Sequence, residues 1–393
     1  MIKQAISDKV FILDAGRTVS ASPFKSLKEY SSADLVSAVL SGILKRNNLD
    51  KNYIDQVIIG NALAAGRGQN IARQASVKAG LPVTVNSYSI DDVCASGLQA
   101  VISATLSIVA GNCGFVFAGG AESISKAPFL SQREAFIKKE SFEPIDSLKC
   151  DGLFCDITKK RMGELAEDLA RKQKISREKQ DEYALGSHQR ACRAIEQGAF
   201  LAEILSVGSD KSGKEKDDRP RAALDMEILR NYPPAFDEKG TVTAGNSSVP
   251  TDAAAAVLLC SKAAFKKVKI KPIAQILGYS SIMIDPVSTF EASVISVEEC
   301  LRACRLRVKD IDLFEIAEAF AVQAIYSKEA LGIPDEKYNV NGGDVALGHP
   351  LGAVGARILA TLIHSLKNKK LKRGIASVPF GGGGAVTVLI ETM

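Results

Sequence analysis

The sequence contains no tryptophan, and aromatic residues make up only 6% of its 393 positions. With so few aromatic side chains, we do not expect a stacking platform for single-stranded nucleic acid. The 50 lysines and arginines barely exceed the 45 aspartates and glutamates, so the chain also lacks the basic excess of a dedicated nucleic-acid binder. A large globular core is expected instead, because 46% of the residues are hydrophobic and 24% are charged.

The sequence also lacks histidines and cysteines at the spacing that is typical of metal ligands. The three histidines, His188, His349 and His364, pair neither with a cysteine nor with one another at ligand distance along the chain. The eight cysteines form no Cys-x-x-Cys motif. We therefore expect no metal and no resident cofactor.

No secretory signal or membrane span is evident in the sequence. Residues 1–17 begin as an alternating, strand-like pattern rather than as a basic stretch followed by an apolar one. The longest apolar stretches, such as Ala100–Gly111, are interrupted by serine and threonine and fall short of the ~18 residues that a span needs. This pattern predicts a cytoplasmic protein whose cysteines are reduced and lie mostly in the core.

The chain repeats itself at long range. Three segments of a first copy match three segments of a second copy: Ile54–Ala64 matches Ile311–Ala321, Ser96–Leu106 matches Gly352–Leu362, and Gly114–Gly120 matches Gly374–Gly384. The first two pairs are separated by 257 and 256 residues. Each match is weak, but three in the same order indicate a duplicated α/β unit.

Within each copy, strands alternate with helices and no hairpin signal lies between them, which predicts mostly parallel sheets buried between helices. A segment of different, Lys/Glu-rich composition separates the copies. We predict a first half of residues 1–121 with 250–270, an insert of 122–249, and a second half of 271–393. A polar run at 206–221 inside the insert predicts a solvated loop, with a basic rim for an acidic ligand as the alternative.

One cysteine and one histidine occupy matching places in the two copies. Cys94 lies just before the first small-residue helix, where unpaired N–H groups would stabilise a thiolate. At the offset of 256, His349 corresponds to Val93, so both side chains belong to loops at the starts of equivalent helices. A core cysteine and a buried structural histidine are the ordinary alternatives. The matching places favour a nucleophile with its base.

The glycines Gly381–Gly384 match neither a P-loop nor a dinucleotide fingerprint. They predict a tight turn, or alternatively an oxyanion hole, because glycine lets a substrate carbonyl approach the backbone.

The sequence resembles the thiolase family, which includes acetyl-CoA acetyltransferases and 3-ketoacyl-CoA thiolases, over nearly its whole length. The segments that carry the resemblance are Val93–Leu98, Ala118–Ser123, Pro234–Asp237, Thr241–Asn246, Asn339–Gly343 and Gly348–Gly352. The resemblance implies a five-layer α/β/α/β/α core of two similar halves, with a loop domain that binds coenzyme A. It also implies a homodimer or homotetramer and a place in lipid metabolism.

The resemblance further implies a ping-pong acyl transfer. Cys94 would take the acyl group from a coenzyme A thioester, His349 would activate the thiol, and the N–H groups of Cys94 and Gly381 would bind the oxyanion. Positions that the resemblance implies for substrate binding are Met162, Arg219, Phe236, Ala244, Ser248, Ala319 and Phe320.

The sequence departs from the thiolase pattern at four places. Pro379 stands where the family carries a second cysteine that exchanges protons with the substrate, and Ala317 replaces an asparagine that helps to hold an oxyanion water. Arg161 replaces a common histidine, and Val249 stands where a glycine usually follows the serine at Ser248. These departures leave three readings open: a thiolase-type enzyme with an impaired Claisen step, an acyltransferase or decarboxylative condensing enzyme with another acceptor, and a coenzyme A-binding homologue without turnover.

Overall fold

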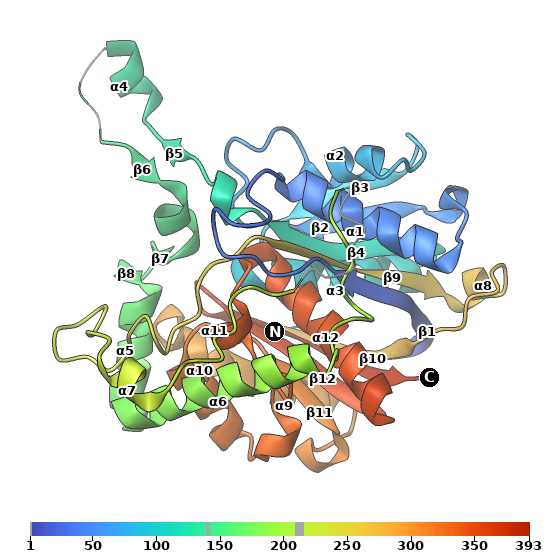
Figure 1. Cartoon of the computed structure of the whole chain (residues 1–393). Coiled ribbons are helices and arrows are strands. Elements are labelled where there is room, and N and C mark those ends of the chain that lie inside the picture. The colour runs from blue at the N-terminus through green and yellow to red at the C-terminus, as the bar shows by residue number, and fades with distance from the viewer. Residues whose placement is uncertain (1, 139–140, 142, 209–215) are drawn as a thin grey trace.

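The computed structural model describes residues 2–138, 141, 143–208 and 216–393. Residues 209–215, the middle of the polar run predicted as a solvated loop, lie outside this range. Figure 1 shows a large sheet folded between layers of helices, with the predicted insert along one side of it.

One sheet of nine strands organises the described residues. Its spatial order is β11 (Leu313–Ile316), β12 (Arg373–Phe380), β13 (Gly384–Thr392), β10 (Ala274–Met283), β1 (Ile2–Arg17), β9 (Ala253–Ser261), β4 (Phe115–Glu122), β2 (Gln56–Gly60) and β3 (Asn86–Ile90). The two halves of the chain meet where β1 pairs with β10.

The prediction of mostly parallel strands is wrong. Only β2 with β3, β2 with β4, and β11 with β12 are parallel, while the other five neighbouring pairs are antiparallel. The helical crossovers that the alternating pattern predicted produce those three parallel pairs. Elsewhere the chain returns from the insert as β9, antiparallel to β4, and turns directly from β12 into β13.

The glycine run forms the hairpin turn between β12 and β13. Gly382 and Gly383 have φ angles of 95° and 90°, a region that favours glycine over residues with a side chain. The sequence therefore did contain a hairpin signal, the four consecutive glycines at 381–384.

The sheet order confirms the duplication. Strands β1, β9, β4 and β2 correspond to β10, β13, β12 and β11, in opposite spatial order about the β1–β10 junction. The central helices α3 (Ser96–Val109) and α12 (Val354–Lys369) also correspond, each preceded by a short turn at 93–95 and 351–353. The starts of these equivalent elements (93 and 351, 96 and 354, 115 and 373) lie 258 residues apart. The predicted offset of 256 is thus wrong by two residues, and His349 corresponds to Asp91.

Five layers follow from the way the side chains divide between the faces of the sheet. Along β9, Val257 and Leu259 point into a core that contains α3 and α12, while Leu258 and Cys260 point into a core beneath α1 (Ser32–Asn47) and α2 (Ile71–Lys78). On the far side of the second half, α9 (Ala292–Ala303) and α10 (Ala321–Ala330) cover a third core. The predicted α/β/α/β/α arrangement is confirmed and can be followed in Figure 1.

The predicted insert contains short strands and the longest helix in the described residues. Its residues 162–196 pack along the second half, whereas residues 129–138 and 145–146 extend away from the body (Figure 1). Its elements are β5 (Phe129–Leu130), α4 (Arg133–Lys138), β6 (Ile145–Asp146), β7 (Phe154–Cys155), β8 (Lys160–Arg161), α5 (Met162–Gln173), α6 (Arg177–Glu196) and α7 (Met226–Arg230). Two short helices complete the chain, α8 (Lys262–Phe265) and α11 (Asp344–Leu347). No helix among the described residues has the length and apolar character of a membrane span.

Two helical glycines allow α3 and α12 to approach closely. A Cβ atom on Gly97 would lie 2.8 Å from the Gly352 carbonyl oxygen, and one on Gly355 would lie 2.7 Å from the Leu98 nitrogen. These distances are too short for a side chain, so the two halves can meet here only through glycine.

We expect Gly97→Val to lower the free energy of unfolding by ~1–3 kcal/mol or more, because overpacking forces the central helices apart. Gly186→Ala is the matched control, since this helical glycine in α6 faces only the end of the Arg190 side chain at 3.2 Å. Alanine there should leave the stability unchanged or raise it by up to ~1 kcal/mol, because alanine favours helix. Scanning calorimetry measures both effects, and equal melting temperatures for the two variants would contradict the prediction.

Candidate active site

Cys94 lies in a strained turn directly before α3. Val93 has a φ angle of 48°, which is uncommon for a β-branched residue. The Ser96 hydroxyl stabilises the turn because it accepts a hydrogen bond from the Asp92 N–H at 2.8 Å and donates one to the Val93 carbonyl at 2.6 Å. The side chain of Cys94 is half-buried and lines a small cavity at the junction of the two halves.

His349 lies in the corresponding loop before α12. Gly348 precedes it with a φ angle of 88°, and a Cβ atom there would lie 2.3 Å from the Thr251 side chain. The backbone N–H of His349 donates to the Val249 carbonyl at 2.8 Å. The segment that leaves the insert therefore holds this loop in place.

A buried carboxylate contacts the far side of the His349 ring. The Nδ1 atom of His349 lies 3.1 Å from Oδ2 of Asp344, which also accepts the Glu318 backbone N–H at 2.8 Å. The other Asp344 oxygen accepts a hydrogen bond from the Arg357 guanidinium. Asp344 is the single acidic residue between Asn339 and Arg357.

The near side of the His349 ring faces the cavity that Cys94 lines. Its Nε2 atom is buried and has no hydrogen-bond partner of standard geometry among the described residues. Burial by itself lowers the pKa of His349, but the negative charges of Cys94 and Asp344 outweigh burial and raise it to about 10. The arrangement thus favours an imidazolium that faces the cavity beside Cys94.

The cavity around this pair has a volume of about 60 Å³, and the structure brings most of the predicted site residues to it. Those that line it are Cys94, Met162, Ser248, Ala319, Phe320, His349 and Gly381. Ser248 is fixed by the Ala319 carbonyl, which accepts its hydroxyl at 2.9 Å and its N–H at 3.0 Å.

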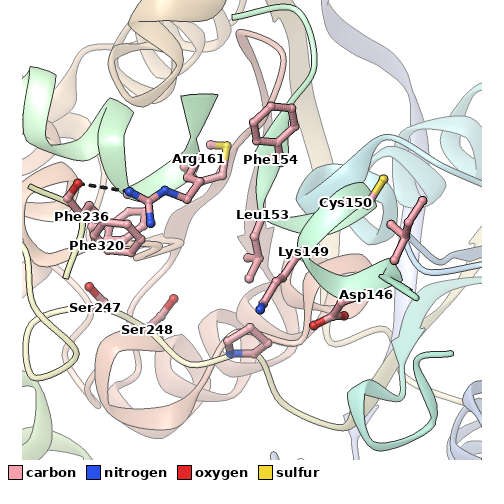
Figure 2. A pocket seen from close by; sticks show the side chains of 14 residues that line it. Asp146, Lys149, Cys150, Leu153, Phe154, Arg161, Phe236, Ser247, Ser248 and Phe320 are labelled. Carbon is pink, nitrogen blue, oxygen red and sulfur yellow. Dashed lines mark hydrogen bonds between the residues drawn. The ribbon is translucent and has the colours of Figure 1, made fainter. Parts of the chain in front are cut away.

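A larger outer cavity of about 690 Å³ continues from the small one (Figure 2). The two share Leu153, Met162, Ser248, Pro250 and Phe320. Most of the outer lining is apolar.

Polar side chains occupy the remainder of that lining. Lys149 and Arg161 bring positive charge, and the dashed line in Figure 2 marks the bond that Arg161 donates to the Phe236 carbonyl at 3.1 Å. Phe236, a predicted substrate-binding residue, lines this outer cavity only.

Two predicted site residues line neither cavity. Ala244 is exposed in the loop at 241–246. Arg219 is half-buried near Arg221, and burial and the charge of Arg221 lower its pKa. The same two arginines, after burial itself, lower the pKa of His188 to about 4, so these three side chains form a separate basic cluster.

The departures from the thiolase pattern also have a place in the structure. Pro379 lines the small cavity beside Cys94, where it offers neither a proton nor an N–H group. Ala317 is buried outside the lining of that cavity, and its backbone N–H donates to the Ser377 carbonyl at 2.9 Å. Arg161 directly precedes α5 and pairs with Glu164 in its first turn.

Sequence reasoning missed Asp344, which contacts His349 from the side away from the cavity, and Arg357, which pairs with Asp344. The lone acid shortly before His349 was the available signal. Across the described residues, no three His, Cys, Asp or Glu side chains gather as a metal site.

Comparison with known proteins agrees with this architecture. The sequence profile described as "Thiolase, N-terminal domain" matches residues 10–263, and that described as "Thiolase, C-terminal domain" matches residues 270–392. The chain is 40% identical to the probable acetyl-CoA acyltransferase of Staphylococcus aureus strain COL, over 98% of this chain and 99% of the relative. It is also 40% identical to an acetyl-CoA acetyltransferase of Escherichia coli K12, over 97% and 98% of the two chains.

A solved structure of a thiolase has the same fold. Human mitochondrial 3-ketoacyl-CoA thiolase in complex with CoA superposes with a TM-score of 0.95 at 34% identity, over 99% of each chain.

We expect His349 to stabilise the folded protein in a pH-dependent way. Because its pKa rises from 6.5 to about 10 on folding, its contribution is complete below pH 6.5 and is lost as the pH rises toward 10. The difference in unfolding free energy between the wild type and His349→Gln should therefore shrink over this range in urea titrations. Cys94→Ser, which removes one of the two raising charges, should move the loss to lower pH. A difference that is constant with pH would contradict the prediction.

Proposed function

The chain belongs to the thiolase family of acyltransferase enzymes, and we propose that its acyl transfer from acyl-CoA passes through a thioester on Cys94. The observation that carries this proposal is the pairing of Cys94 with His349 on one cavity, with the Nε2 atom of His349 free of other partners. A thiolate beside an imidazolium is the activated nucleophile that acyl transfer requires.

In the first half-reaction, Cys94 Sγ attacks the carbonyl carbon of the acyl-CoA. The bond between that carbon and the CoA sulfur breaks, and His349 gives its Nε2 proton to the departing CoA thiolate. The acyl group then remains on Cys94 as a thioester. In the second half-reaction, His349 can accept a proton from the incoming acceptor.

The oxyanion of this reaction is assigned to the backbone N–H groups of Cys94 and Gly381. Gly381 lines the cavity at the start of the β12–β13 turn, and a Cβ atom there would lie 3.3 Å from the Met162 sulfur. A side chain at this position would crowd the acyl group, whereas glycine leaves its N–H accessible. One such donor is worth ~10²–10³-fold in rate.

Coenzyme A is assigned to the outer cavity and to the insert of 122–249. The long apolar cavity suits the pantetheine arm, with Met162, Phe236 and Ser248 along it. Arg219 and Arg221 of the basic cluster supply positive charge for the phosphates at the nucleotide end, with His188 neutral beside them, and the exposed Ala244 is assigned to the rim. The complex of the human relative with CoA supports a CoA site in this fold.

The condensing half of thiolase chemistry is proposed to be impaired. Claisen condensation needs a base for a weakly acidic α-proton, and Pro379 offers no such group in the cavity. An acyltransferase or decarboxylative condensing enzyme with another acceptor is the second candidate, and a CoA-binding homologue without turnover is the third. The intact pair of Cys94 and His349 favours the two enzymatic candidates. The homo-oligomeric state and the cytoplasmic location stay predictions.

The proposed acyl-enzyme is tested directly with acetyl-CoA. Intact mass spectrometry should find one acetyl group on the wild type, mapped to Cys94 by peptide analysis, and none on Cys94→Ser. Cys113→Ser is the matched control, since this free thiol lines neither cavity and the substitution is expected to leave the labelling unchanged. Equal labelling of Cys94→Ser and the wild type would remove Cys94 from the mechanism, and a wild type that stays unlabelled would favour the homologue without turnover.

The impaired condensing step is tested by deuterium exchange into the methyl group of acetyl-CoA in heavy water. We expect exchange at least ~100-fold slower than acetylation of Cys94, because a positioned base contributes ~10²–10⁴-fold. Pro379→Cys together with Ala317→Asn should raise the exchange rate. Rapid exchange in the wild type would show that another group serves as the base.

A further inference from the structure

Two carboxyl groups and one guanidinium lie behind His349, away from the cavity. Asp344, Glu315 and Arg357 are all at most 2% exposed. Burial of a charged group is costly unless the group is paired and hydrogen-bonded. The protonation state of each carboxyl group therefore depends on how Arg357 is shared between them.

Arg357 forms its ion pair with Asp344. It accepts the Arg357 guanidinium on one oxygen, and the Glu318 N–H and the His349 ring on the other. Burial by itself raises the pKa of Asp344, but Arg357 and His349 outweigh burial and lower it. Asp344 is therefore ionised at neutral pH.

Glu315 is the neutral member of the pair. It accepts no hydrogen bond on Oε1, and burial raises its pKa well above the usual range although Arg357 opposes that effect. With Glu315 protonated, the charge of Arg357 remains available to Asp344. Two carboxyl groups whose environments separate their protonation states in this way are typical of functional sites.

We propose that Asp344 is the positioning residue of a Cys94–His349–Asp344 triad, and that Arg357 holds Asp344 ionised and in place for this role. The inference deepens the proposed function and rests on it for the identity of the acyl donor. The ionised Asp344 accepts the Nδ1 proton of His349, which fixes the ring orientation and leaves Nε2 directed at the cavity. Asp344 touches neither the cavity nor the reacting atoms, so it acts only through His349.

In this triad the base is His349, and Asp344 orients it from the side of the ring that faces away from the cavity. His349 gives its Nε2 proton to the departing CoA thiolate and takes a proton from the acceptor, while its Nδ1 proton stays on the bond to Asp344. The ionisable groups around His349 and Asp344 are Cys94 from the turn at 93–95, Arg357 from α12, Glu318 after β11 and Glu315 on β11. Loss of the Asp344 charge leaves Cys94 as the main anion beside His349.

The experiment is the rate of alkylation of Cys94 by iodoacetamide as a function of pH, followed at the Cys94 peptide by mass spectrometry. Asp344→Asn keeps the size of the side chain and removes its charge, so the imidazolium loses one anion and gives up its proton at lower pH. An adjacent opposite charge shifts a titration by ~1–3 pH units, so near neutral pH we expect alkylation about tenfold slower or more than in the wild type. The two rates should converge at high pH, where the imidazolium is no longer needed.

Asp217→Asn is the matched control. Asp217 is also a buried carboxylate that pairs with a buried arginine, since it accepts Arg17 at 2.8 Å, but it makes no contact with His349. This variant should keep the wild-type shape of the pH profile. If Asp344→Asn does not fold because Arg357 is left unpaired, Asp344→Asn with Arg357→Met removes both buried charges and should shift the profile in the same direction.

A folded Asp344→Asn or double variant with a profile parallel to the wild type would overturn the triad. Alkylation needs no acyl-CoA, so this result is independent of the proposed function. A wild type that is not acetylated by acetyl-CoA, in the presence of the predicted shift in Asp344→Asn, would reject the acyl-enzyme and support the triad. Acetylation together with parallel alkylation profiles would support the acyl-enzyme and reject the triad.

Discussion

The close contact of α3 with α12 is the constraint on which the arrangement of the site depends. Gly97 and Gly355 remove the side chains that would separate the two helices, and backbone atoms of each half occupy the space that a Cβ atom would need. Cys94 and His349 belong to the loops that precede these helices, so the helix contact fixes how close a thiol and an imidazole from distant parts of the chain can come. The active-site geometry is therefore a consequence of helix packing rather than of local loop structure.

Buried carboxylates hold the loop around His349 in its place. Glu122, at the end of β4, accepts the Gly352 N–H at 3.1 Å and the Asn61 amide at 2.7 Å, and so ties the turn after His349 to the first half. Burial raises the pKa of Glu122 to about 7 although backbone N–H groups at Gly352, Ala62 and Leu63 oppose that shift. Asp344 holds the same loop from within the second half, and the positive charge of Arg357 compensates for the burial of the Asp344 carboxylate. One histidine loop is thus held by acidic groups from both halves.

The cavity combines Cys94 and His349, the pair proposed for acylation, with an altered opposite wall. Pro379 is tolerated in the interior of the sheet because β11 ends opposite Ser377, so no neighbouring strand on that side requires an N–H group from position 379. The wall that a second thiol would occupy is consequently apolar and rigid. The proposed chemistry therefore depends on Cys94 and His349 alone among the side chains of this cavity.

The sequence by itself determined the duplicated α/β unit, and its resemblance to the thiolase family implied the five-layer core and most of the predicted residues that line the small cavity. The duplication follows from the three repeated segments, and the resemblance rests on short motifs around Cys94 and His349, which are local features of the chain. The antiparallel order of the sheet, the offset of 258 residues, and the places of Arg219 and Ala244 outside both cavities were decided only by the tertiary structure. The same holds for the contact of His349 with Asp344 and of Asp344 with Arg357. Folding removes water from around this aspartate. Its charge is then set by the groups it contacts in the interior, which its position in the sequence does not reveal.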